Sequence, residues 1–196
     1  MIHHNKGHKL PPEPLNQTEW ERLLAACRDG RHACRNEALI ALMHGAGLRC
    51  AEALSIREPD FDPDQGTIRV LRGKGRKCRV VGASAHVVAA VRGWLRERSL
   101  LLPPPDAPII CREAPGCPAL SLRQARTILQ RLGRRAGLVK RTHCHGLRHT
   151  CAVELLAEGV PLAVISRGLG HSNLATTARY LDHISPVDVV QYMRSR

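Results

Sequence analysis

One segment of the chain, between residues 67 and 81, has the alternating pattern of β-strands, and the other periodic segments are helical. Apolar and polar residues alternate in TIRVLR (67–72) and KCRVV (77–81), which flank the turn sequence GKGR. Two such runs around a glycine-containing turn predict a β-hairpin. One small hairpin among helices, with no internal repeat, predicts a single α+β domain that is mostly helical.

The helical segments are bounded by capping residues, glycine or proline. Asn16 and Glu19 have the spacing of a capping box, and Ser84 and Ser121 each precede a long helical pattern. The expected helices span about 17–27, 33–44, 49–56, 85–101, 122–136, 145–158, 161–168 and 174–181, with a last one from Pro186. Residues 1–14 form a polar, proline-broken tail, so we expect residues 15–196 to form the domain.

The charge of the chain predicts a polyanionic partner. Thirty Lys and Arg residues against seventeen Asp and Glu give a formal net charge of +13 and a pI near 10.2. Such an excess is most often typical of nucleic-acid binding and sometimes of binding to an anionic membrane. Aromatic residues make up 3% of the chain, too few for the stacking platforms of single-strand binders. We therefore expect contacts to the phosphates of a DNA duplex.

A membrane partner and secretion are disfavoured. No apolar run approaches the roughly 18 residues of a membrane span, and no basic amphipathic helix carries bulky apolar residues. The N-terminus, MIHHNKGHKLPPEP, lacks the apolar centre of a signal peptide. A cytoplasmic protein is expected. Its eight cysteines contain no CxxC pair, so we predict reduced thiols within the apolar interior.

The stretch HCHGLRHT (143–150) has the highest density of potentially functional side chains, with three histidines and one arginine. His145 and Arg148 are three residues apart and share one face of the expected helix, next to an apolar stripe of Leu147, Cys151 and Leu155. Arginine presents a planar fork that matches phosphate oxygens, and histidine can move a proton near neutral pH. The pair suits an anion that must be held and protonated. A solvated basic face is the alternative for this segment alone.

Three other segments carry candidate residues. His171 precedes Tyr180 by nine residues, although a tyrosine there could also belong to the core. Arg49 follows a glycine turn and has Glu52 three residues on, which could be a surface ion pair. Lys74 lies between two glycines, where the backbone can approach a phosphate closely, although a solvated turn lysine would look the same.

Together these segments resemble the catalytic domain of the tyrosine recombinase (phage integrase) family. The resemblance covers about residues 15–185 and includes four motifs in the family's order: GLRCAEAL, RGKGRKCRVV, HGLRHT, and LGHS followed by TTARYL. Each motif alone is weak. The ordered set with the nine-residue spacing between histidine and tyrosine is specific.

The resemblance assigns six side chains to DNA strand exchange without metal or cofactor. Two arginines would clamp the scissile phosphate, a lysine would protonate the leaving 5′ oxygen, two histidines would assist, and a tyrosine would form a 3′-phosphotyrosyl link. In that order the residues are Arg49 and Arg148, Lys74, His145 and His171, and Tyr180. The implied activity is site-specific recombination or integration of double-stranded DNA, as in mobile elements.

The remaining histidines of HCHGLRHT have no catalytic assignment. His149 follows the arginine in the motif and is expected to be a structural hydrogen-bonding residue, whereas His143 stays without a role. The spacing of His143, His145 and His149 would also suit zinc, but only Cys144 adds a thiolate or acidic ligand nearby. We therefore expect no metal.

The resemblance also bears on the two ends of the chain. Most carry a separate N-terminal DNA-binding domain, whereas the motifs here begin close to Met1, as in the catalytic-domain-only invertases of fimbrial switches. We expect no such domain here, which could mean weaker DNA binding, reliance on an accessory DNA-binding protein as a further partner, or a truncated remnant that no longer recombines. In relatives the C-terminal segment docks on a neighbouring protomer of a tetramer. We expect the same of residues 183–196, with folding back on the same chain as the alternative.

Three activities are compatible with the motifs. The first is a recombinase, whether it inverts, excises or integrates DNA. A type IB topoisomerase would use the same side chains without a defined pair of sites. A non-catalytic protein that occupies recombination sites is the third, although such a protein would not need all six side chains.

Overall fold

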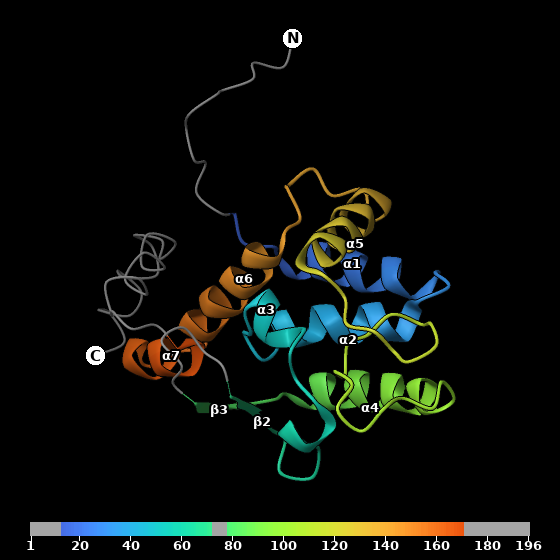
Figure 1. Ribbon diagram of the computed structural model, residues 1–196. Helices are drawn as coiled ribbons and strands as arrows, with labels where there is room; N and C mark the ends of the chain where they lie inside the picture. Colours follow the sequence, from blue (N-terminus) through green and yellow to red (C-terminus); the bar gives the residue numbers. More distant parts are fainter. Residues whose placement is uncertain (1–12, 72–77, 171–196) are drawn as a thin grey trace, which may run out of the picture.

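The computed structural model describes residues 13–71 and 78–170 (Figure 1). Helices dominate, with one small sheet, so the predicted mostly helical α+β fold is confirmed. The helices are α1 (Gln17–Arg28), α2 (Ala33–His44), α3 (Cys50–Ala53), α4 (Ala85–Ser99), α5 (Leu122–Arg135), α6 (Cys144–Ala157) and α7 (Leu162–Leu169), with a 3₁₀ turn η1 (Glu58–Asp60).

Helix α2 is the centre of the fold. It packs against α1, α4 and α6, and Figure 1 shows it between α4 on one side and α1 with α5 on the other. Every residue from Ala38 to His44 is buried. A helix that is apolar on all sides must be covered on all sides, which explains why this one is enclosed by the others.

The sheet has three antiparallel strands in the order β1 (Phe61–Asp62), β2 (Thr67–Val70) and β3 (Arg79–Gly82). Ile68 pairs with Val81, and both side chains are buried in the core. The hairpin prediction is confirmed, although the strands are 67–70 and 79–82 rather than 67–72 and 77–81. The sequence did not reveal β1, because two residues are too few to show an alternating pattern. The GKGR turn lies outside the described residues.

The predicted caps are present. In α1 the Asn16 side chain accepts a hydrogen bond from the amide of Glu19 (2.9 Å), and the Glu19 carboxylate accepts one from the amide of Asn16 (2.9 Å). The Ser84 and Ser121 hydroxyls accept hydrogen bonds from the amides of Val87 and Gln124, and at Ser121 the Gln124 side chain also bonds back to the cap amide. The end of α4 was overestimated, since it stops at Ser99. The helices expected at 174–181 and from Pro186 lie outside the described residues.

Helix α3 is much shorter than the 49–56 expected. It ends at Ala53, and the Ser55 hydroxyl donates a hydrogen bond to the carbonyl oxygen of Glu52 (2.9 Å), which closes the helix. A serine that bonds the preceding turn competes with helix continuation. The result is one helical turn that follows directly after Arg49.

All eight cysteines, which lie within the described residues, are free thiols; Cys78 is the exposed one. Within the same residues no helix is long and apolar enough to cross a membrane.

Candidate active site

Arg49 is positioned by a glycine turn between α2 and α3. Gly47 has a φ of +59°, and a Cβ atom there would lie 2.6 Å from the side chain of Leu169. Only glycine both adopts this conformation easily and leaves room for α7. The turn therefore brings Arg49, the residue before α3, beside the C-terminal end of α7.

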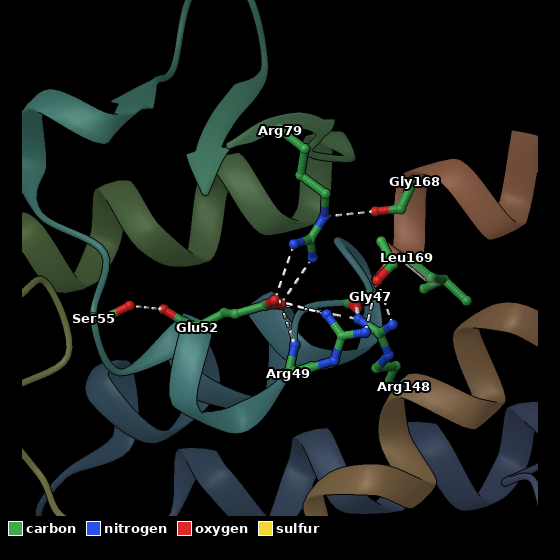
Figure 2. A network of polar contacts seen from close by, with 9 residues as sticks. Gly47, Arg49, Glu52, Ser55, Arg79, Arg148, Gly168 and Leu169 are labelled. Carbon is green, nitrogen blue, oxygen red and sulfur yellow. Dashed lines mark hydrogen bonds and ion pairs between the residues drawn. The ribbon is translucent and has the colours of Figure 1, made fainter. Parts of the chain in front are cut away.

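Glu52 connects Arg49 to a second arginine on the sheet. The Arg49 guanidinium donates to Glu52 Oε1 (2.8 Å), and the Arg49 amide donates to Oε2 (2.8 Å). Arg79, at the start of β3, donates to both carboxylate oxygens through its two terminal nitrogens (2.9 and 2.8 Å) (Figure 2). Glu52 is 4% exposed, so the surface-pair alternative for Arg49 and Glu52 is wrong.

Arg148 reaches the same place from α6. Its side chain is 2% exposed, and it donates to the carbonyl oxygens of Gly47 (2.7 Å) and Leu169. Its guanidinium also lies 3.9 Å from Glu52 Oε2. The alternative of a solvated basic face is therefore wrong for Arg148, because this arginine is part of the interior (Figure 2).

The three arginines meet at the C-terminus of α7. Arg79 Nε donates to the Gly168 carbonyl (3.0 Å), Arg148 to that of Leu169, and Arg49 to that of Gly170 (2.8 Å). The last carbonyl groups of a helix lack partners within the helix and carry its negative dipole end, so cations stabilise them. His171 follows Gly170 directly in the sequence.

The ionisation of Glu52 depends on these arginines. Burial raises the pKa of this carboxyl group, but hydrogen bonds from Arg79 and Arg49 outweigh burial and lower the pKa to about 2. Glu52 is thus an anion at neutral pH. With one carboxylate and three guanidiniums, these four side chains carry a net charge of two positive units.

His145 lies at the edge of this cluster, in the first turn of α6, and is exposed. Partial burial lowers its pKa below 6.5, and the charges of Arg148 and Arg49 lower it further. A neutral imidazole beside two guanidiniums can accept a proton at neutral pH. In the sequence, His145 and Arg148 follow Arg49 by 96 and 99 residues. The fold nevertheless brings the three side chains together.

The other three predicted site residues, Lys74, His171 and Tyr180, lie outside the described residues. Two of them adjoin the cluster in sequence: Lys74 precedes β3 in the hairpin, and His171 follows the end of α7.

His149 is 3% exposed inside α6, as expected of a structural residue. His143 occupies the N-cap position of α6, and burial lowers its pKa, as do the charges of Arg141 and His145. Its Nδ1 atom is buried and has no hydrogen-bond partner. Among residues 13–71 and 78–170, no three His, Cys, Asp or Glu side chains are grouped in a way that could hold a metal ion.

The sequence interpretation missed Arg79. The strand KCRVV gives a usable signal, because Arg79 and Val81 are two residues apart and so face the same side of the sheet. Val81 is buried, and the side chain of Arg79 is 13% exposed. An arginine at an inward strand position needs a buried partner, and Glu52 supplies it.

The comparisons with known proteins agree with this geometry. The profile of the phage integrase family matches residues 13–185. The chain is 33% identical over 195 residues to tyrosine recombinase XerC of Xanthomonas axonopodis pv. citri, which covers 97% of this chain and 62% of that protein. It is 36% identical over 178 residues to tyrosine recombinase XerA of Thermococcus kodakarensis, covering 89% and 61%. The chain belongs to the phage integrase family.

Solved structures share the fold. The crystal structure of XerA recombinase superposes with a TM-score of 0.81 at 24% identity, over 100% of this chain and 67% of that one. XerH site-specific recombinase bound to its difH substrate, in a pre-cleavage complex, gives a TM-score of 0.75 at 28% identity, over 98% and 56%. The chain thus spans about 60% of the length of the two relatives named above.

Proposed function

We propose that this protein is a site-specific DNA recombinase that cleaves and rejoins duplex DNA through a 3′-phosphotyrosyl intermediate. The observation that carries the proposal is the convergence of Arg49 and Arg148, from a turn and a helix far apart in sequence, on the Glu52 carboxylate, with His145 near both arginines. Family membership and the six motif residues in order support it.

The chemistry needs charge stabilisation and proton transfer. Attack by the Tyr180 oxygen on phosphorus forms the phosphotyrosyl bond and breaks the bond to the 5′ oxygen. Charge that builds on the non-bridging oxygens would be stabilised by Arg49 and Arg148. Lys74 would supply the proton to the leaving 5′ oxygen, and His145 and His171 would assist. The phosphotyrosyl link conserves the energy of the broken bond, so the strands can be rejoined without ATP.

Neutral His145 fits the tyrosine's requirement. A phenol of ordinary pKa, about 10, is ionised in only about one molecule in a thousand at neutral pH. The site must therefore supply positive charge or a base near the nucleophile. Arg49 and Arg148 carry positive charge, and burial and these two arginines lower the pKa of His145, so its neutral imidazole can act as the base.

The proposed partner is double-stranded DNA, which the net charge of +13 and the similarity to XerH, solved with its difH substrate, support. We further propose that the protein acts as a homotetramer on DNA, with residues 183–196 docked on a neighbouring protomer and an accessory DNA-binding protein assisting. The tetramer is what the family resemblance implies.

Covalent trapping tests the proposal. The protein is incubated with nicked duplexes built from the DNA that flanks its gene, beside the variants Tyr180→Phe and Tyr192→Phe. We expect an adduct that resists denaturation and is lost only in Tyr180→Phe. Salt-sensitive binding to the same duplexes without any adduct would favour a non-catalytic DNA-binding protein. Relaxation of any supercoiled plasmid, whatever its sequence, would favour a type IB topoisomerase.

A further inference from the structure

We propose that Arg79 is a positioning residue of the active site, which holds the Glu52 carboxylate and the end of α7 in the geometry that orients Arg49 and Arg148. The effect on catalysis rests on the proposed function, but the effect on Glu52 does not. Arg79 lies outside the six motif residues assigned to the chemistry.

The contacts of Arg79 are complete and directional. Both terminal nitrogens bind the two oxygens of Glu52, and Nε binds the Gly168 carbonyl. A bidentate arginine–carboxylate pair fixes both planes, which a lysine cannot do. All three side-chain nitrogens of Arg79 are bound within the protein, and 13% of the side chain is exposed.

The position of Arg79 joins three parts of the site. It opens β3, the strand that follows the hairpin turn carrying Lys74. Its carboxylate partner also receives the amide and the guanidinium of Arg49. Its backbone partner belongs to the same helix end that receives Arg148. A shift of Arg79 would therefore change the orientation of both Arg49 and Arg148.

Space at the helix end depends on the same side chain. Gly170 ends α7 with a φ of +65°, and a Cβ atom there would lie 2.9 Å from the Arg79 guanidinium. The glycine lets the guanidinium lie flat against the backbone just before His171. The close approach indicates that Arg79 and the end of α7 fit each other specifically.

Loss of Arg79 should make Glu52 titratable. The carboxyl group would remain buried, which raises its pKa, while it lost two of its hydrogen bonds. Arg49 and Arg148 would still face it, and His145 lies beside both arginines. Protonated Glu52 no longer attracts the Arg49 guanidinium, so activity should fall at acidic pH and recover as pH rises.

The first readout needs no DNA. Melting temperature is measured from pH 4.5 to 8.5 for the wild type, Arg79→Met, Arg79→Lys and the double variant Arg79→Met with Glu52→Gln. Arg92→Met is the control, since Arg92 forms an exposed pair with Asp64 on the surface. We expect Arg79→Met to lose stability relative to the wild type as pH rises through the raised pKa of Glu52, because a buried carboxyl group without its arginine is tolerated when protonated and costs stability when ionised. The lysine variant should lose less, and the double variant should lose this extra pH dependence.

The second readout is the rate of adduct formation over the same pH range. We expect the ratio of rates at pH 8 and pH 6 to rise about tenfold in Arg79→Met, because a buried carboxyl group can titrate near neutral pH. Protonation of His145 would lower the rate at acidic pH in every variant. An acid limb of the pH profile that is caused by protonation of Glu52 would be absent from the double variant. Arg92→Met should follow the wild type.

The outcomes separate the two proposals. Superposable pH profiles for Arg79→Met and the wild type in both readouts, or an acid limb that persists unchanged in the double variant, would overturn the positioning role. The expected stability profiles without an adduct from the wild type would uphold the control of Glu52 by Arg79 and contradict the proposed recombinase activity instead.

Discussion

Two buried arginines on different helices show how the same side chain is used in two ways. Arg98 of α4 is 1% exposed and binds the Glu58 carboxylate and the Ala107 carbonyl (3.0 Å). Arg148 of α6 is 2% exposed and belongs to a group in which three arginines surround one carboxylate. The first arginine is matched by one acid, while the second group carries positive charge beyond its acid.

The difference concerns charge balance. An arginine paired with one carboxylate is neutral as a pair and does not attract an external anion. A group with net positive charge at a helix end, beside a neutral histidine, provides the field that a phosphodiester needs. Burial of an arginine alone therefore does not identify a functional site. The ratio of arginines to carboxylates distinguishes the two regions: one to one at Arg98 and three to one at Arg148.

The largest difference should appear in catalysis. We expect Arg148→Ala to slow adduct formation about 10²- to 10³-fold, since one preorganised donor to a developing oxyanion typically contributes about 3 to 4 kcal/mol. Single-turnover rates measure the effect. Arg98→Met, which removes the same charge, should keep the wild-type rate per folded molecule; equal losses in the two variants would break the comparison.

The stability of the protein at acidic pH should show how strongly the arginines stabilise the Glu52 carboxylate. Its pKa falls from an ordinary 4.5 to about 2 on folding, so its ionised form stabilises the fold fully above pH 4.5. That contribution, about 3 kcal/mol, is lost as pH falls through about 2. Denaturant titrations of the wild type from pH 5 to pH 2 should show this loss, and Glu52→Gln should lack it. Parallel curves would mean that Glu52 is not stabilised as an anion.

A smaller effect on stability is expected at the balanced pair. Arg98→Met should lower the free energy of unfolding by about 2 kcal/mol, the typical contribution of a hydrogen bond to a charged group. Glu58 stays solvated because its side chain is 55% exposed, which limits the cost. Urea unfolding at pH 7 measures this value, and a change below 0.5 kcal/mol would show that the pair is dispensable.

The smallest effect should come from exposed arginines. Arg126 lies on α5, is exposed, and forms no ion pair with the described part of the chain. We expect Arg126→Ala to weaken duplex binding less than tenfold and to reduce the salt dependence by about one ion. Equilibrium binding at several salt concentrations measures both. A loss of cleavage at unchanged affinity would place Arg126 with the buried cluster instead.

Local signals in the sequence predicted the parts of the structure that local forces determine. The cap at Asn16 and the hairpin strands depend on neighbours a few residues away, and both were predicted. The length of α3 was wrong because Ser55 ends the helix, which periodicity does not show. Family motifs identified Arg49 and Arg148, but the part played by Arg79 depends on Glu52, 27 residues earlier, and on α7.

The central claim is that the buried arginines stabilise the negative charge of the scissile phosphate. The most direct measurement replaces that phosphate with a neutral methylphosphonate in a nicked duplex and compares cleavage by the wild type and Arg148→Ala. We expect the rate loss caused by Arg148→Ala to shrink at least about tenfold on the neutral linkage, because less charge then needs stabilisation. An equal loss on both linkages would contradict the claim and leave Arg148 as a purely structural residue.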